Sequence, residues 1–208
     1  MCGGGKALLP AAFVCDHMGR VSALFDLPPV APEGFRYRDD FLSPAEEAEL
    51  AAHLAELDFE PFQFRGYEAR RRVHSFGYRY DFNAQKLEAA DPIPDWLADV
   101  RARAEAFAGV APGALQQLLI NEYLPGAPIG WHRDRPQFEK VVGISVGAAC
   151  IFRLRRRVRA GFERASLTLE PRSAYLISGV AREQWEHSIP PVEAHRYSVT
   201  FRSFRSSP

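Results

Sequence analysis

The segment from Asn121 to Asp134 reads Asn-Glu-Tyr-Leu-Pro-Gly-Ala-Pro-Ile-Gly-Trp-His-Arg-Asp and ends in a His-x-Asp pair. In an extended chain, residues two positions apart point to the same face, so His132 and Asp134 can converge on one ion. His187 follows further along the chain. Two imidazoles and one carboxylate on one face of a metal leave the opposite positions free, as in non-haem Fe(II) sites. The pattern predicts such a site, although His-x-Asp also occurs by chance in polar turns that bind no metal.

A second informative stretch runs from Arg196 to Arg202 and reads as a β-strand. Alternate residues of a strand face opposite ways, so one face carries Arg196, Ser198, Thr200 and Arg202, and the other carries Tyr197, Val199 and Phe201. An ordinary half-buried strand would point its arginines at solvent. The alternative is a pocket for a dicarboxylate, because guanidinium matches carboxylate with two parallel hydrogen bonds. Asn121 and Tyr123, also two positions apart, can offer an amide and a phenol to the same ligand.

Four motifs occur in a fixed order over about eighty residues: Asn121-x-Tyr123-x-Pro125-Gly126, Ile129-Gly130-Trp131-His132-x-Asp134, His187-Ser-Ile-Pro190 and Arg196-x-Ser-x-Thr-Phe-Arg202. In residue type, order and spacing they resemble the AlkB family of 2-oxoglutarate-dependent dioxygenases. The resemblance implies a mainly β fold with flanking helices and a double-stranded β-helix (jelly-roll) core. It also implies that Fe(II) is bound by His132, Asp134 and His187, and that O2 reacts there. The cosubstrate 2-oxoglutarate would be held by Arg196 at its distal carboxylate, with the pocket completed by Asn121, Tyr123, Ser198 and Arg202.

The activity implied by the resemblance is oxidative demethylation of alkylated bases in single-stranded or duplex DNA, or in RNA. The products would be formaldehyde, succinate and CO2. One departure concerns the substrate, because repair members usually carry an acidic residue just after the iron aspartate, where this chain has Arg135 and Pro136. The same chemistry on transfer RNA, a protein side chain or a small molecule is the alternative. A catalytically silent nucleic-acid-binding jelly-roll is a third reading.

A substrate lid is expected at residues 59–82, where aromatic residues alternate with arginines. Rings stack on the bases of single-stranded nucleic acid while guanidinium groups meet phosphates, although an edge hairpin with solvated arginines is also compatible with the pattern. Within it, Arg71-Arg72-Val73-x-x-Phe76-Gly77-Tyr78 resembles the lid of eukaryotic members that hydroxylate a transfer-RNA wobble uridine. The predicted substrate contacts are Phe76, Tyr78, Tyr80, Trp131, Arg135, Arg182 and Trp185, with a core role for Trp185 equally open.

Length and composition favour one domain over residues 1–208, with 1–34 as an N-terminal extension. The formal net charge is zero, so attraction to nucleic acid must come from local clusters such as the arginines between 153 and 164. These arginines either border the groove as phosphate contacts or lie on a solvated loop. Cys2, Cys15 and Cys150 lack paired or metal-like spacing, which predicts a reducing, cytoplasmic setting. We expect a monomer with no membrane association.

Local patterns predict the flanking elements. Ser43-Pro44-Ala45-Glu46 is a capping-box start for a helix that reaches about Leu57, and a second helix is expected from about Pro94 to Ala108, with Gly109 at its exit. Short runs between glycine and proline turns predict strands at Phe35–Phe41, Leu118–Tyr123, Val141–Val146, Cys150–Leu154, Ser166–Leu169, Ala174–Ile177 and Arg196–Phe204.

Overall fold

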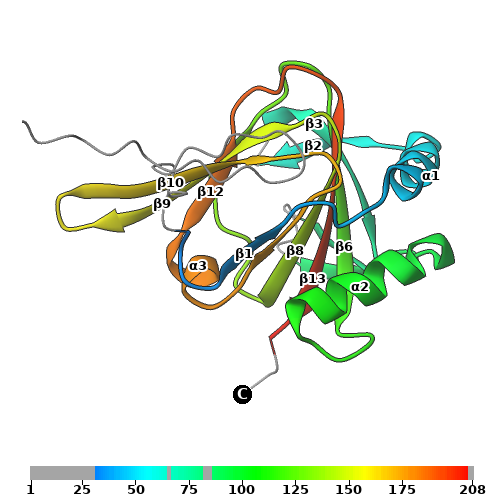
Figure 1. Ribbon diagram of the computed structural model, residues 1–208, viewed down its shortest axis with the longest axis horizontal. Helices are drawn as coiled ribbons and strands as arrows, with labels where there is room; N and C mark the ends of the chain where they lie inside the picture. The colour runs from blue at the N-terminus through cyan, green and yellow to red at the C-terminus, as the bar shows by residue number, and fades with distance from the viewer. Residues whose placement is uncertain (1–30, 65–66, 82–85, 206–208) are drawn as a thin grey trace, which may run out of the picture.

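The computed structural model describes residues 31–64, 67–81 and 86–205 (Figure 1). Most of the predicted N-terminal extension, with Cys2 and Cys15, therefore lies outside the described residues, as do short parts of the predicted lid. The described strands are β1 (Phe35–Arg38), β2 (Glu60–Phe64), β3 (Tyr67–Phe76), β4 (Tyr78–Asp81), β5 (Lys86–Ala89), β6 (Leu115–Tyr123), β7 (Ile129–His132), β8 (Phe138–Gly147), β9 (Cys150–Val158), β10 (Gly161–Leu169), β11 (Ala174–Ile177), β12 (Glu186–Ile189) and β13 (Arg196–Phe204). The helices are α1 (Pro44–Ala55), the 3-10 helix η1 (Asp95–Leu97), α2 (Ala98–Ala108) and α3 (Gly179–Gln184).

Two antiparallel sheets form the body of the molecule. The larger has the strand order β1-β11-β8-β13-β6-β3-β2, and the smaller has the order β10-β9-β12-β7. Helices α1 and α2 lie on the side of the larger sheet that faces away from the smaller one (Figure 1). The predicted mainly β jelly-roll with flanking helices is confirmed. In the described residues no helix is long and apolar enough to cross a membrane.

Two hydrophobic cores follow from this layering. The first joins the helices to the larger sheet and includes Leu54, Leu97 and Val199. The second fills the space between the two sheets and includes Phe152 and Trp185. Side chains pack against both faces of β13. Tyr197, Val199 and Phe201 point into the core beside the helices, and Ser198, Thr200 and Arg202 point to the space between the sheets. All of its residues from Arg196 to Ser203 are buried.

Both predicted helices are present. The Ser43 hydroxyl accepts a hydrogen bond from the Glu46 backbone N–H at 3.2 Å, and the Glu46 carboxylate accepts one from the Ser43 N–H at 2.7 Å. This capping box starts α1, which ends at Ala55, slightly before the predicted Leu57. Gly109 ends α2 with a φ of 64°, a left-handed conformation that glycine adopts without a Cβ clash.

Candidate active site

Strands β7 and β12 bring the predicted iron ligands together. They pair so that His132 and His187 are direct partners, with ring centroids 4.2 Å apart. Asp134, two residues beyond His132, places Oδ2 3.6 Å from Nε2 of His187. The three side chains, drawn from segments more than fifty residues apart, therefore meet on the inner side of the smaller sheet.

Neighbouring groups orient these ligands. Nδ1 of His132 lies 2.9 Å from the Gly130 carbonyl oxygen, and when Nδ1 carries the proton it donates there and leaves the Nε2 lone pair free. Nε of Arg202 donates to Oδ1 of Asp134 at 2.7 Å, and Nη1 of Arg202 donates to Oε1 of Gln117 at 2.8 Å. One oxygen of Asp134 is thus held by the guanidinium and the other faces His187.

The electrostatics favour the protonation states that a cation needs. Burial lowers the pKa of His187 to about 3, and burial also lowers the pKa of His132. Burial alone would raise the pKa of Asp134, but Arg202 and the two imidazoles outweigh it and hold that pKa well below its ordinary value. The site therefore combines two neutral imidazoles with an anionic carboxylate at neutral pH.

In the part of the chain that the structure describes, no three His, Cys, Asp or Glu side chains already stand in coordinating geometry. The chemistry of the donors still fits Fe(II), because two imidazoles and one carboxylate form its facial set and leave three positions for other ligands. His132, Asp134 and His187 are the residues that would hold the ion.

Arg196 lies nearby on β13 and is 1% exposed. Its Nη2 donates to Oγ of Ser145 at 3.0 Å, and its Cζ lies 5.0 Å from the centre of the Tyr123 ring. Its Nε and Nη1 have no hydrogen-bond partner among the described residues. A buried charge without a counter-ion is strongly unfavourable, so this guanidinium is prepared for an anion that the protein itself does not supply.

Comparison with known proteins agrees with this geometry. The family model of the 2OG-Fe(II) oxygenase superfamily matches residues 34–202. The chain belongs to this superfamily. Within it, the chain is 27% identical to the "Alkylated DNA repair protein ALKBH8 homolog" of Arabidopsis thaliana over 81% of its own length. It is 27% identical to the "tRNA (carboxymethyluridine(34)-5-O)-methyltransferase alkbh8" of Xenopus tropicalis over 90% of its length.

The chain spans 58% and 30% of the lengths of these two relatives. The solved structure of OsALKBH1 superimposes with a TM-score of 0.66 at 16% identity, covering 82% of this chain and 96% of that one. The structural likeness supports the fold, and the relatives identify an AlkB-like 2OG-Fe(II) oxygenase.

A groove of about 2400 Å³ is lined by most of the predicted site residues of this oxygenase. Its lining includes all three predicted iron ligands and, from the predicted cosubstrate set, Asn121, Tyr123, Ser198 and Arg202. Arg196 is buried and does not line this groove. Oδ1 of Asn121 accepts a hydrogen bond from Nε of Arg71 at 3.3 Å. Arg71, Gln117 and Tyr175 also line the groove and were not predicted as cosubstrate contacts. The alternation along β3 and β6 carries the signal for Arg71 and Gln117, whereas Tyr175 sits in an apolar run that reads as core.

The predicted substrate contacts of the oxygenase divide into two groups. Tyr78, Tyr80, Trp131, Arg135 and Arg182 line the groove. The guanidinium of Arg135 stacks on the Tyr80 ring, and Arg182 donates to the backbone carbonyl of Arg135.

Phe76 and Trp185 do not share that position, because they are only 6% and 3% exposed and pack in the two hydrophobic cores. Phe76 turns toward the helices at the end of β3, directly before the left-handed Gly77. For Trp185 the core reading is the one that the structure supports.

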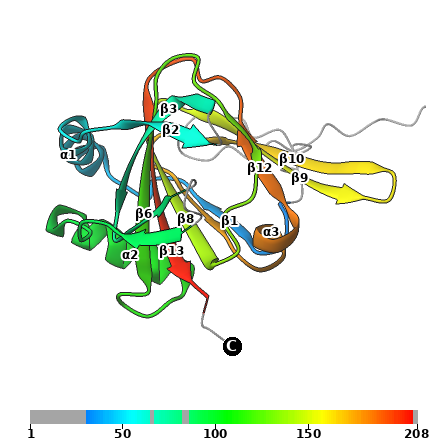
Figure 2. The same ribbon diagram turned by 180° about the vertical axis from the view of Figure 1, so that it is seen from behind.

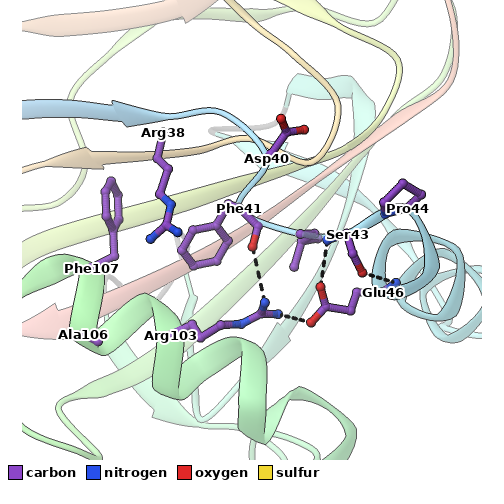
Figure 3. Close-up of a pocket in the computed structure, with 10 residues that line it drawn as sticks. Arg38, Asp40, Phe41, Ser43, Pro44, Glu46, Arg103, Ala106 and Phe107 are labelled. Carbon is purple, nitrogen blue, oxygen red and sulfur yellow. Dashed lines mark hydrogen bonds and ion pairs between the residues drawn. The ribbon is translucent and has the colours of Figure 1, made fainter.

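A separate hollow of about 600 Å³ lies on the helix side of the larger sheet (Figure 3). Arg103 of α2 donates to the Phe41 carbonyl oxygen at 3.4 Å and pairs with Glu46 of α1 at 2.8 Å. These contacts join the two helices. The hollow is therefore a gap between packed elements of the fold.

Proposed function

We propose that this protein is an oxidative demethylase that removes alkyl groups from nucleic-acid bases, in DNA or in RNA. The observation that carries the proposal is the buried, partly unpartnered guanidinium of Arg196, which acts electrostatically on the same buried Tyr175 ring as Asp134 of the His132, Asp134 and His187 cluster. Such a guanidinium suits the distal carboxylate of 2-oxoglutarate. When bound, Fe(II), 2-oxoglutarate and O2 supply the oxidising power that hydroxylates an N-methyl carbon, after which the hydroxymethyl group leaves as formaldehyde.

The residues of the chain have distinct roles in this proposal. His132, Asp134 and His187 hold the iron, and Arg202 keeps Asp134 anionic and oriented. Asn121, Tyr123 and Ser198 complete the cosubstrate pocket around Arg196. The base enters the groove between the aromatic rings of β4 and β7 and the arginines Arg135 and Arg182, where stacking can hold it out of its helix.

The proposal is tested with Fe(II), 2-oxoglutarate and a single-stranded oligonucleotide that carries an N-methylated base. Formaldehyde release and the mass of the restored base are measured together. We expect His132→Ala to fold and to lose both signals, because a metal ligand that lines an open groove is not needed by the cores. Succinate formation with an unchanged base would contradict the demethylase and leave the oxygenase class intact.

Hydroxylation of transfer RNA is the second candidate. A transfer-RNA substrate agrees with the name of the Xenopus tropicalis relative, a transfer-RNA methyltransferase of which this chain spans 30%, and hydroxylation agrees with the motif from Arg71 to Tyr78. Arg135, which stands where repair members of the family usually carry an acidic residue, points the same way. Mass spectrometry of transfer RNA after incubation separates the candidates, because hydroxylation adds one oxygen whereas demethylation removes a methyl group. Protein and small-molecule substrates are examined in the same assay format.

A further inference from the structure

The β9–β10 hairpin projects from the body of the molecule in both views (Figures 1 and 2). From residue 150 to 169 the hairpin carries one acidic residue, Glu163, and six arginines: Arg153, Arg155, Arg156, Arg157, Arg159 and Arg164. The whole chain has a formal net charge of zero, so this is a local concentration of positive charge. The segment forms a paired hairpin, so the alternative of a solvated loop is wrong.

The two faces of the hairpin differ. On the face that continues into the core, Phe152 and Leu154 are buried, and Arg156 pairs with the opposite Glu163 at 2.6 Å. On the outer face the register places Arg155 opposite Arg164 and Arg157 opposite Phe162. Arg157 and Arg164 make no ion pair with another described residue, so the outer face keeps a net positive charge.

Aromatic rings order the outer arginines. The Cζ atom of Arg155 lies 4.3 Å from the centre of the Trp131 ring and 4.6 Å from that of Phe162. The guanidinium of Arg164 also lies over Phe162, at 5.5 Å. Nε of Arg155 donates to Glu186, and Nη1 of Arg164 donates to the Phe162 carbonyl oxygen at 3.3 Å. Stacking on a ring leaves the remaining N–H groups of each guanidinium at its edge, where they match the oxygen atoms of a phosphate.

This arginine row begins at the groove. Trp131 and Glu186, which pairs with Arg155 at 2.7 Å, both line the groove that contains the iron ligands. Arg153, Arg155 and Arg157 follow on one strand face with a spacing of about 6.6 Å, since each strand residue advances about 3.3 Å. When one base of a nucleic-acid strand enters the groove, the flanking nucleotides must leave the groove along one of its sides. The arginines of the hairpin lie along such a side and can bind the phosphates of these nucleotides.

We propose that the outer face of the β9–β10 hairpin binds the phosphate backbone of nucleotides that flank the one in the groove. This rests on the proposed nucleic-acid substrate and adds a contact surface outside the iron site. It predicts that affinity rises with substrate length, because a fragment that fills only the groove does not reach Arg157 and Arg164.

The test is fluorescence anisotropy with unmodified single-stranded oligonucleotides of about 4 and about 16 nucleotides, titrated at several salt concentrations. The double variant Arg157→Gln/Arg164→Gln should bind the longer oligonucleotide more weakly. Its slope of log affinity against log salt should be less steep by about 1.4, because each lost single-strand phosphate contact removes about 0.7. Affinity for the shorter oligonucleotide should be close to that of the parent.

The matched control is Arg36→Gln/Arg38→Gln, which removes two exposed arginines of β1 that stack on Phe107 and Phe41 on the helix side of the larger sheet. Its salt slope should equal that of the parent, and all three proteins should share one thermal unfolding midpoint within a few degrees. Equal slopes for the hairpin and control variants would overturn the proposal. A parent that binds vesicles of anionic lipid in preference to the longer oligonucleotide would overturn it too. Because the oligonucleotides are unmodified, failure of base repair does not affect this readout, and the two proposals can fail separately.

Discussion

Gly143 illustrates how a single residue shapes the floor of the groove. It lies on β8 between Tyr175 of β11 and Thr200 of β13, and a Cβ built there would overlap the Tyr175 ring. The absent side chain at 143 therefore makes the space that the ring fills.

We predict that Gly143→Ala lowers the free energy of unfolding by about 1–3 kcal/mol, because a buried ring must leave its position. Combining it with Tyr175→Leu, which removes the overlapping atoms, should recover part of this loss. Urea unfolding of the parent, both single variants and the double variant measures the coupling. Strict additivity of the two changes would show that the ring and the glycine do not constrain each other.

The proposed role of Arg196 predicts different effects on cosubstrate binding and on stability. We predict that Arg196→Ala weakens 2-oxoglutarate binding by about 30-fold or more, since losing one partner of a buried charge pair costs about 2–5 kcal/mol. In the absence of 2-oxoglutarate, the free energy of unfolding should fall by much less than the binding free energy, because the variant removes a buried cation that lacks a counter-ion. Calorimetric titration and urea unfolding give the two quantities. A residue with a purely structural role would lose stability and keep its affinity.

His187 gives the metal-free protein a defined pH dependence. Its pKa is about 3 in the folded protein, where burial disfavours the imidazolium, and about 6.5 in an unfolded chain. Between these values the unfolded state binds the extra proton, so stability should fall as the pH is lowered from about 6.5 towards 3. Thermal unfolding with a chelator should show this decline, and His187→Gln should make it shallower. Parallel profiles would contradict the assignment.

For single residues, the sequence predicts which side chains share a face when they lie on the same extended segment. His132 with Asp134, and Arg196 with Ser198 and Arg202, follow from period-two alternation. His187 lies next to His132 because β7 pairs with β12. Local spacing in the sequence does not reveal this pairing, so only the family resemblance predicts His187 as a ligand. The prediction of Phe76 as a substrate contact is not supported, because its alternation with Arg71, Val73 and Ser75, which line the groove, places it on the opposite face, in the core beside the helices.

Among the elements, α1 shows how a short motif fixes a boundary. We predict that Ser43→Ala lowers the free energy of unfolding by about 1 kcal/mol, because the Glu46 backbone N–H loses its acceptor. Ser43→Asp, which keeps an acceptor at the cap, is the control and should stay close to the parent. Urea unfolding monitored by circular dichroism provides the comparison. A similar loss in both variants would mean that position 43 matters for packing and not for capping.

The strands were predicted with varying success for physical reasons. Strands β11 and β13 have the predicted bounds because their apolar or alternating runs end at clear turns. Strands β7 and β12 have only four residues each, too few to establish a period, although they carry two of the predicted iron ligands. Helix α3 has only six residues, and local helix propensity does not distinguish so short a helix from a loop.

For the whole molecule, the decisive feature is that the two sheets face each other and enclose the groove. The family resemblance of the ordered motifs and the number of short predicted strands indicate this architecture. The sequence pattern carries less information about the length of individual strands. It does not predict that the β9–β10 hairpin extends beyond the sandwich, because strand length past the core is set by pairing between β9 and β10 and not by burial.

The central position of β13 in the larger sheet has a consequence for synthesis in the cell. Strands β6 and β8 both pair with β13, and neither pairs with the other. Before residues 196–204 are synthesised, β6 and β8 each have one hydrogen-bonding edge without its partner strand. Such edges can recruit other chains, so the nascent protein is exposed to misassociation until its late segment emerges and closes the gap. Chaperone protection should matter most in that interval.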